Sequence, residues 1–334
     1  MTVTLADILS AAATIRGRAD ATPMVPSVFF EGRHGHPFWL KLEIAQPIGA
    51  FKLRGALNAV ASLPPDAAGV TCCSTGNHGR GVAYAAQERG VRAVVCMSEL
   101  VPRPKVEGIR ALGAEVKIVG RSQDAAFAES ERLARDEGLV AISPFDDPKV
   151  IAGQGTIGLE MLARCPELDT LLIPLSGGGL AAGVAAAAKA INPGIRCIGV
   201  TMDRGAAMYE SLKAGKPVEV EEVESLADSL GGGIGLENQL TFSMCRDLLD
   251  DVVLVTEAEI YHALQMLYHE ERLIAEGACV VGMAAVEAGK IDLTGPTGTI
   301  LTGRNLDMDV FTRIVTGQDV TLGDTVIEGR PYAA

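Results

Sequence analysis

The sequence lacks long apolar runs, an excess of basic residues and an abundance of aromatic side chains, and each absence excludes a class of protein. Aromatic residues make up 4% of the 334 residues, so we expect a core built mainly from alanine, valine, leucine and isoleucine. The formal net charge of −13 predicts a surface that repels polyanions, and we expect no nucleic-acid partner. No run reaches the ~20 apolar residues of a membrane helix. The alanine-rich run 180–190 is too short and is predicted to be a buried helix.

Cysteine and histidine are too scattered for a disulfide framework or a zinc site. The seven cysteines include no C-x-x-C pattern, and their odd number favours reduced thiols in the cytoplasm. His262 and His269 have no third ligand between them, so we expect packed or exposed histidines. Residues 1–15 lack the basic start of a signal peptide and have helical periodicity after Thr4, a predicted N-cap. The sequence therefore predicts a cytoplasmic protein with no membrane partner and no bound metal.

Short apolar segments alternate with segments of helical period along most of the chain, which is typical of parallel sheets with helices on both faces. We predict an α/β protein with two open, mostly parallel twisted sheets and flanking helices. The predicted strands are 38–42, 70–74, 93–97, 115–119, 139–142, 170–175, 195–200, 252–255 and 299–302. Predicted helices include 81–88, 105–112, 125–137 and 150–163.

The strand–helix units between residues 53 and 142 are sufficient for a sheet of their own. We therefore predict a small domain at 46–145 and a large domain formed by 1–45 plus 146–334. Ligands of open α/β sheets usually bind beyond the carboxyl ends of the strands. The turns that follow predicted strands are therefore the first places to look for a site.

Three glycine-containing turns follow predicted strands. In Ser176–Leu180 three consecutive glycines let backbone N–H groups converge on an anion, and the following helix N-terminus adds partial positive charge. This turn fits a phosphate, although it lacks the spacing of nucleotide-binding loops, and a simple strand-to-helix turn is the alternative. The other two turns are Ser74–Gly79 and Thr302–Asn305.

Lys52 lies among small and apolar residues, in Gly49–Ala56, just before a predicted helix. In an apolar cleft at a helix N-terminus a lysine has a depressed pKa, as Schiff-base chemistry requires. The alternative is that Lys52 and Arg54 are ordinary surface charges. The helix dipole disfavours this at a helix start, but from the residues alone we favour the surface-charge interpretation. His78 is either an acid–base group or a structural histidine, and we favour the structural interpretation.

Together these motifs resemble the threonine/serine dehydratase and serine racemase family, which has fold type II of the pyridoxal-phosphate enzymes, similar to the tryptophan synthase β chain. The resemblance rests on Gly-Ala-Phe-Lys-Leu-Arg-Gly-Ala, Ser-Thr-Gly-Asn-His-Gly, Ser-Gly-Gly-Gly-Leu and Thr-Gly-Arg-Asn, in that order. It extends to segments 142–148, 150–156 and 275–278, and so spans nearly the whole chain.

The resemblance implies that Lys52 holds pyridoxal 5'-phosphate as a Schiff base, that Asn77 bonds the ring hydroxyl and that Thr302 faces the pyridine nitrogen. The implied cofactor-binding residues are Phe51, Lys52, Asn77, Ser176, Gly177, Gly178, Gly179, Leu180 and Thr302. The residues implied to bind the substrate carboxylate are Ser74, Thr75, Gly76 and His78.

The implied reaction is β-elimination from a small β-hydroxy amino acid. Freed Lys52 takes the α-proton, the β-hydroxyl leaves, and the products are a 2-oxo acid and ammonia. Thr75 is the second implied catalytic residue, because racemase-type relatives place a serine hydroxyl there to protonate the opposite face. Threonine has a stiff χ1 angle, so we expect elimination to dominate over racemisation.

Some positions depart from the family pattern. Thr201 and Ala207 stand where racemase-type members often have carboxylates for a divalent metal, and Ser229 stands where glycine is usual. Arg304 replaces a glycine and resembles the hydroxyectoine-utilisation dehydratase branch, which leaves the physiological substrate open.

Several alternatives remain at this point. Serine racemase and a non-catalytic protein that binds pyridoxal phosphate both fit the motifs. A β-replacement enzyme such as cysteine synthase usually has Thr-Ser-Gly-Asn-Thr, which is absent. A nucleotide-binding Rossmann protein fits the composition but does not explain Lys52. We expect a homodimer or a higher homo-oligomer with a small amino acid as its substrate.

Overall fold

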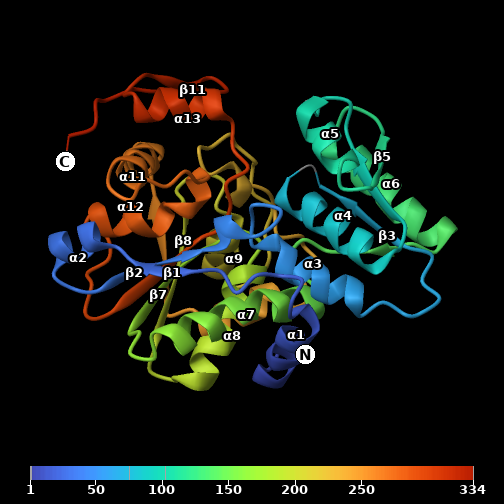
Figure 1. Cartoon of the computed structure of the whole chain (residues 1–334). Coiled ribbons are helices and arrows are strands. Elements are labelled where there is room, and N and C mark those ends of the chain that lie inside the picture. The colour runs from blue at the N-terminus through green and yellow to red at the C-terminus, as the bar shows by residue number, and fades with distance from the viewer. Residues whose placement is uncertain (1, 75, 102, 334) are drawn as a thin grey trace.

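The chain forms two lobes, each built around its own sheet (Figure 1). The computed structural model describes residues 2–74, 76–101 and 103–333. The larger sheet has the strand order β1-β2-β10-β7-β8-β9, and every pair in it except β1–β2 is parallel. Its strands are β1 (Met24–Pro26), β2 (Phe38–Leu42), β7 (Thr170–Pro174), β8 (Arg196–Met202), β9 (Asp251–Val255) and β10 (Thr297–Leu301).

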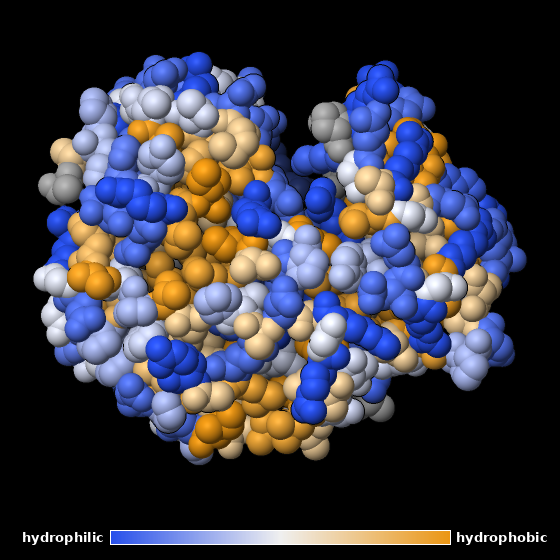
Figure 2. Space-filling model, in the orientation of Figure 1, coloured by the Kyte–Doolittle hydropathy of each residue, from blue (hydrophilic) through white to orange (hydrophobic). Residues whose placement is uncertain are grey.

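The smaller sheet is entirely parallel and has the order β5-β4-β3-β6. Its strands are β3 (Val70–Cys73), β4 (Ala93–Met97), β5 (Glu115–Ile118) and β6 (Val140–Ala141). All four lie within the predicted small domain at 46–145, and the division into two domains at those boundaries stays a prediction. Figure 2 shows the lobes separated by a notch at the top of the view.

Helices flank both sheets. The α-helices are α1 (Leu5–Ile15), α2 (Val28–His34), α3 (Lys52–Ala61), α4 (Asn77–Arg89), α5 (Arg103–Arg110), α6 (Gln123–Glu137), α7 (Pro148–Arg164), α8 (Gly179–Ile191), α9 (Ala207–Ala214), α10 (Thr241–Leu248), α11 (Glu257–His269), α12 (Val281–Glu287) and α13 (Met308–Val315). Short 3-10 helices are η1 (Glu43–Ala45), η2 (Asp228–Leu230) and η3 (Gly277–Cys279). Together with the sheets, they give the predicted fold class, α/β with two open, mostly parallel sheets.

The predicted elements are present, with shifted ends. Each predicted strand overlaps an observed one, α8 is the buried alanine-rich helix, and Thr4 forms a capping box with Asp7 at the start of α1. Three observed strands were not predicted: β1 and the two strands of a hairpin, β11 (Val320–Leu322) and β12 (Thr325–Ile327). These strands have three residues each, too few for a recognisable alternation.

Close contacts between glycines bring α3, α7 and α8 together. A Cβ on Gly153 of α7 would lie 2.6 Å from Gly55 Cα of α3, and one on Gly183 of α8 would lie 2.7 Å from Gly155 N of α7. Any side chain at these positions would push the helices apart. Glycine therefore fixes α3, which begins at Lys52, relative to α8, which begins at the predicted phosphate-binding turn.

A buried ion network holds α3 from its other side. Arg54 is 1% exposed, and its guanidinium lies 2.8 Å from a carboxylate oxygen of Glu43 and 2.7 Å from one of Glu160. Lys41, also 1% exposed, contacts the same two carboxylates. The interpretation of Arg54 as a surface charge is wrong, because its charge is paired inside the protein.

Candidate active site

Three helices begin at the predicted site segments, and all three start without a capping side chain. α3, α4 and α8 have no side-chain hydrogen bond at their N-caps and no acidic residue in their first turns. By contrast, α1, α7 and α11 are capped by threonine or aspartate side chains, although α9, α10 and α12 also lack a side-chain cap. The first N–H groups of α3, α4 and α8 are therefore suited to bind an anionic ligand.

The turn Ser176–Leu180 joins β7 to α8 and leaves no room for side chains at its glycines. Gly178 has a φ of +90°, and a Cβ there would lie 2.7 Å from Met208 Cε. A Cβ on Gly177 would lie 2.3 Å from a ring atom of Phe145. The sequence thus provides bare backbone at the start of α8, which fits a phosphate. The assignment of this loop to phosphate binding stays a prediction.

Lys52 is the first residue of α3, and its amine is partly buried. Its Nζ donates to the carbonyl oxygen of Pro144 at 2.6 Å and lies 5.3 Å from the centroid of the Phe51 ring. Burial lowers the pKa of Lys52 to about 8. The direction of this shift agrees with the apolar setting, and the partly buried, bonded amine shows that Lys52 is not an ordinary surface charge.

The segment 144–146 connects Lys52 to the glycine turn. Pro144 accepts the hydrogen bond of Lys52, and Phe145 packs against Gly177 and Gly179. Asp146 accepts backbone N–H groups at the start of α10 at 2.6, 2.9 and 2.9 Å. A single loop therefore orients the lysine, closes the glycine turn and fixes a neighbouring helix.

Thr302 follows β10 and lies beside the backbone of the lysine segment. Its carbonyl oxygen accepts Phe51 N at 2.9 Å, and Ala50 pairs with Gly303 as an isolated antiparallel bridge. The Thr302 hydroxyl is buried and lies 3.2 Å from Cys279 Sγ. Burial first, and then the charge of Glu276, raise the pKa of Cys279 to about 12, so the thiol stays protonated and donates to Gly303 O. The turn Thr302–Asn305 does not open a helix directly, since α13 begins at Met308.

Asn77 is bonded on both sides of its amide. Its Nδ2 donates to the two carboxylate oxygens of Glu276 at 3.0 and 3.1 Å. Its Oδ1 accepts from Asn305 Nδ2 at 2.7 Å. Asn77 therefore joins the start of α4 to the turn after β10, where Thr302 lies.

The turn after β3 leads from Ser74, which is partly buried, to Gly76, the N-cap of α4. A Cβ on Gly79 would lie 2.2 Å from Ser74 O, so the helix start packs directly on that residue. His78 is buried and its Nε2 lies 2.8 Å from Ile142 O; burial first, and the charge of Lys52 second, lower its pKa to about 3. This neutral, bonded ring fits the structural interpretation of His78. Thr75 lies outside the described residues.

The structure brings together the predicted residues around Lys52, Asn77 and Thr302, while their individual roles stay predictions. Sequence reasoning gave no role to Pro144, Glu276 and Cys279, which complete this region. Glu276 had a local signal, because it is a lone carboxylate between alanine and glycine in a largely apolar segment. Pro144 contributes only a backbone carbonyl, and since every residue has one, the sequence gives no signal for this contact.

No group of three or more potential metal-ligating side chains that could hold a metal ion occurs within the described residues. The hydroxyl of Thr201, one of the two positions lacking a carboxylate, is directed at Met202 Sδ at 3.7 Å. Within the same part of the chain, no helix combines the length and apolarity needed to cross a membrane. The independence from metal stays a prediction.

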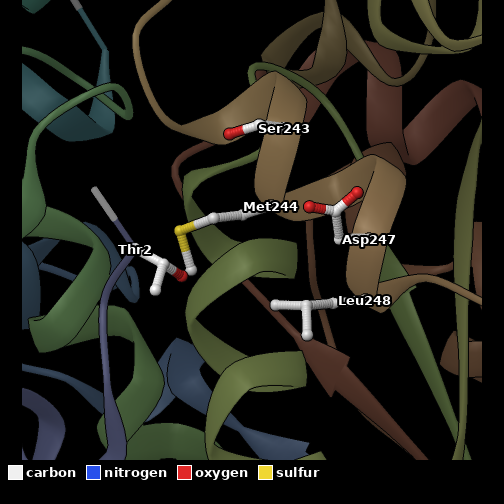
Figure 3. A pocket seen from close by; sticks show the side chains of 5 residues that line it. All are labelled: Thr2, Ser243, Met244, Asp247 and Leu248. Carbon is white, nitrogen blue, oxygen red and sulfur yellow. The ribbon is translucent and has the colours of Figure 1, made fainter.

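A pocket of about 310 Å³ lies elsewhere, against α10 (Figure 3). It is lined by Thr2, Ser243, Met244, Asp247 and Leu248. None of these residues belongs to the predicted site, and Met244 points across the pocket toward Thr2.

Comparisons with known proteins agree with this geometry. A family model described as pyridoxal-phosphate dependent enzyme matches residues 15–303. A Sinorhizobium fredii protein with a provisional threonine dehydratase name is 55% identical over 89% of this chain and 90% of its own length. The L-threonine ammonia-lyase of Geobacter sulfurreducens is 40% identical over 90% of this chain and 75% of its own. The structure of maize serine racemase is similar with a TM-score of 0.88 and 33% identity, covering 94% of this chain and 97% of that one.

Proposed function

Because this chain belongs to the pyridoxal-phosphate-dependent enzyme family, we propose that it removes water and ammonia from a small β-hydroxy amino acid such as threonine or serine. The observation that carries the proposal is the partly buried Lys52, whose pKa is lowered to about 8. The loop 144–146 connects its amine to the glycine turn Ser176–Leu180. When bound, pyridoxal phosphate accepts the electron pair that remains after the α-proton of an amino acid is removed.

The residues present fit this cofactor. The glycines of Ser176–Leu180 would hold the phosphate on backbone N–H groups at the uncapped start of α8. Asn77 would donate to the ring oxygen, and the Thr302 hydroxyl would face the pyridine nitrogen. Phe51 would pack beside the ring, since it immediately precedes Lys52 and lies against the same amine.

Lys52 would then move the α-proton. With a pKa of about 8, its amine is neutral in an appreciable fraction of molecules near neutral pH, and a neutral Nζ can accept a proton. The Pro144 carbonyl orients Nζ, and His78 does not compete for the proton because burial lowers its pKa to about 3. The α-proton and the β-hydroxyl together make up the water that is lost, and a second water hydrolyses the dehydrated amine to the 2-oxo acid and ammonia.

The experiment is a product analysis with purified holoenzyme and L-threonine or L-serine. We expect equimolar 2-oxo acid and ammonia, with no more than trace D-serine formed from L-serine. Serine racemase is the second candidate, favoured by the likeness to the maize structure. D-serine formed as fast as pyruvate would make racemisation the main reaction, and absence of both products would contradict the elimination proposal.

The narrower assignment to the hydroxyectoine-utilisation branch is supported by Arg304. This residue is exposed, its backbone N donates to Gly49 O at 2.9 Å, and its Cγ would lie 3.1 Å from a Cβ on Gly49. The Arg304 side chain therefore starts at the edge of the segment that leads to Lys52. We expect kcat/KM to be higher for a hydroxyectoine-derived hydroxy amino acid than for threonine, and Arg304→Gly to reduce that preference. An unchanged ratio in the variant would remove the support.

The proposal also includes a cytoplasmic location and a homodimer or higher homo-oligomer. The odd number of cysteines, without disulfide-type spacing, supports the location. Light scattering of the purified protein tests the oligomer, and a monomeric mass would contradict it.

A further inference from the structure

We propose that Glu276 is a positioning residue that fixes the direction of the Asn77 amide, so that an N–H of Asn77 is presented to the cofactor's ring oxygen. The proposal rests on the proposed function, because it assumes that pyridoxal phosphate occupies the site. It assigns a role to a carboxylate that would not itself touch the cofactor or the substrate.

Glu276 is held in a closed position next to the predicted cofactor site. Its side chain is buried, with 4% of the residue exposed. One carboxylate oxygen accepts the backbone N–H of Asn305 at 2.8 Å, and both accept Nδ2 of Asn77. A Cβ on Gly303 would lie 2.4 Å from Glu276 Oε1 and 3.0 Å from Asn77 Nδ2, so the backbone of the turn covers this pair closely.

The partners on either side of Asn77 allow only one orientation of its amide. An ionised carboxylate can only accept hydrogen bonds, so the NH₂ group of Asn77 must face Glu276. On the other side, Asn305 Nδ2 donates to Ile48 O at 2.9 Å and to Asn77 Oδ1 at 2.7 Å. The Asn305 amide is therefore a donor, and the oxygen of Asn77 must face it.

This orientation determines what Asn77 can offer a ligand. A primary amide has two N–H groups, and a single N–H directed between the oxygens of Glu276 accounts for both distances. The second N–H remains available, so Asn77 acts as a donor toward the ring oxygen. A donor stabilises the deprotonated form of that oxygen. Reversal of the amide would present a carbonyl instead and would favour the protonated form.

The charged surroundings of Glu276 come from both lobes. The pKa of Glu276 is raised overall, mainly by burial and further by the negative charge of Asp228 in η2. Hydrogen bonds from Asn77, Asn305 and Ser229 act in the opposite direction. Lys105 of α5, in the small sheet's lobe, faces Asp228, and the protonated Cys279 lies on the η3 side. The N–H donors of Asn77 and Asn305 thus oppose the effect of burial and favour the ionised form of Glu276.

The test compares Glu276→Gln with the wild type in cofactor binding and in the visible spectrum of the bound cofactor. Glutamine keeps the shape of the side chain but replaces one acceptor oxygen with an NH₂ group. If the remaining oxygen still accepts the N–H of Asn305, the new NH₂ group faces the NH₂ group of Asn77, and neither can accept a hydrogen bond from the other. We expect cofactor affinity to fall about tenfold or more, because a buried donor is left without an acceptor. We also expect the pH midpoint of the visible absorption band to move upward.

Two further variants separate positioning from general damage. Glu271→Gln is the matched control, since this carboxylate accepts a hydroxyl from Ser27 outside the site and its loss should leave the band unchanged. In an Asn77→Ala background, Glu276→Gln should add little to the loss of cofactor affinity, because the amide it orients is gone. If Glu276→Gln does not fold, Glu276→Asp, which keeps the charge at a shorter reach, should show a smaller shift in the same direction.

The outcomes are distinct for this inference and for the proposed function. A wild-type protein that binds no pyridoxal phosphate contradicts the proposed function. A wild type that binds it normally, with an unchanged affinity and band in both Glu276 variants, overturns only the role of Glu276. Full additivity of the Glu276→Gln and Asn77→Ala effects would also overturn it, because Glu276 would then act independently of Asn77.

Discussion

Burial of Lys52 predicts how the reactivity of this one amine depends on pH in the cofactor-free protein. A pKa of about 8 in place of 10.5 raises the neutral fraction of the amine at pH 7 from ~0.03% to ~9%, an increase of about 300-fold. Only the neutral amine attacks an aldehyde or an acylating reagent, so this factor directly scales the rate of cofactor attachment. We expect the reactivity of Lys52 to rise with pH and to reach half its plateau near pH 8.

The assay is competitive labelling with trace acetic anhydride between pH 6.5 and 10.5, followed by mass spectrometry of the peptide that contains Lys52. A free lysine peptide in the same tube supplies the reference curve, with a midpoint of about 10.4. Steric shielding of Lys52 lowers its plateau but does not move its midpoint. His78 does not distort the curve, because its pKa of about 3 leaves it neutral throughout.

The perturbation that tests the cause is Phe51→Ala, which admits water beside Nζ. Since burial lowers the pKa of Lys52, partial solvation should move the midpoint upward by about one pH unit. A wild-type midpoint close to that of the reference peptide would refute the reasoning. So would a Phe51→Ala curve that coincides with the wild-type curve near pH 8.

Other predictions concern the phosphate turn, the ion network and metals. Gly177→Ala should weaken cofactor binding at least about tenfold in a fluorescence titration, because the new Cβ would lie 2.3 Å from the Phe145 ring. The control is Gly32→Ala, whose Cβ would have no neighbouring atom within 4 Å, and this variant should bind the cofactor normally. Arg54→Met should lower the free energy of unfolding by about 3–5 kcal/mol in a urea titration, because Glu43 would stay charged and buried but lose its main partner. A decrease of less than about 1 kcal/mol would contradict this. Elimination should persist after exhaustive chelation, and a large loss that magnesium or manganese restores would reveal a metal requirement.

The parts of the site that follow from local sequence were predictable. Lys52 and the Ser176–Leu180 turn stand out because a lysine in an apolar segment and three consecutive glycines are short-range patterns. The same holds for α8, whose alanine content and length indicate a buried helix. The fold class followed from the alternation of strand and helix patterns, which is local at every step.

The partners of these residues were not predictable, because they come from distant parts of the chain. The acceptor for Lys52 lies 92 residues away at Pro144, and the carboxylate that bonds Asn77 lies 199 residues away at Glu276. Arg54 was ambiguous for the same reason, since Glu160 is 106 residues from it. A single sequence contains the residue types but not these pairings, which the packing of the two sheets and α7 creates.

The most direct test of the central claim is borohydride reduction of the yellow holoenzyme, followed by peptide mass spectrometry. We expect one added phosphopyridoxyl group per chain, on the peptide that contains Lys52, and none in a Lys52→Ala variant prepared in the same way. Label on a different lysine, or a protein that retains no pyridoxal phosphate in the presence of excess cofactor, would contradict the assignment of this site.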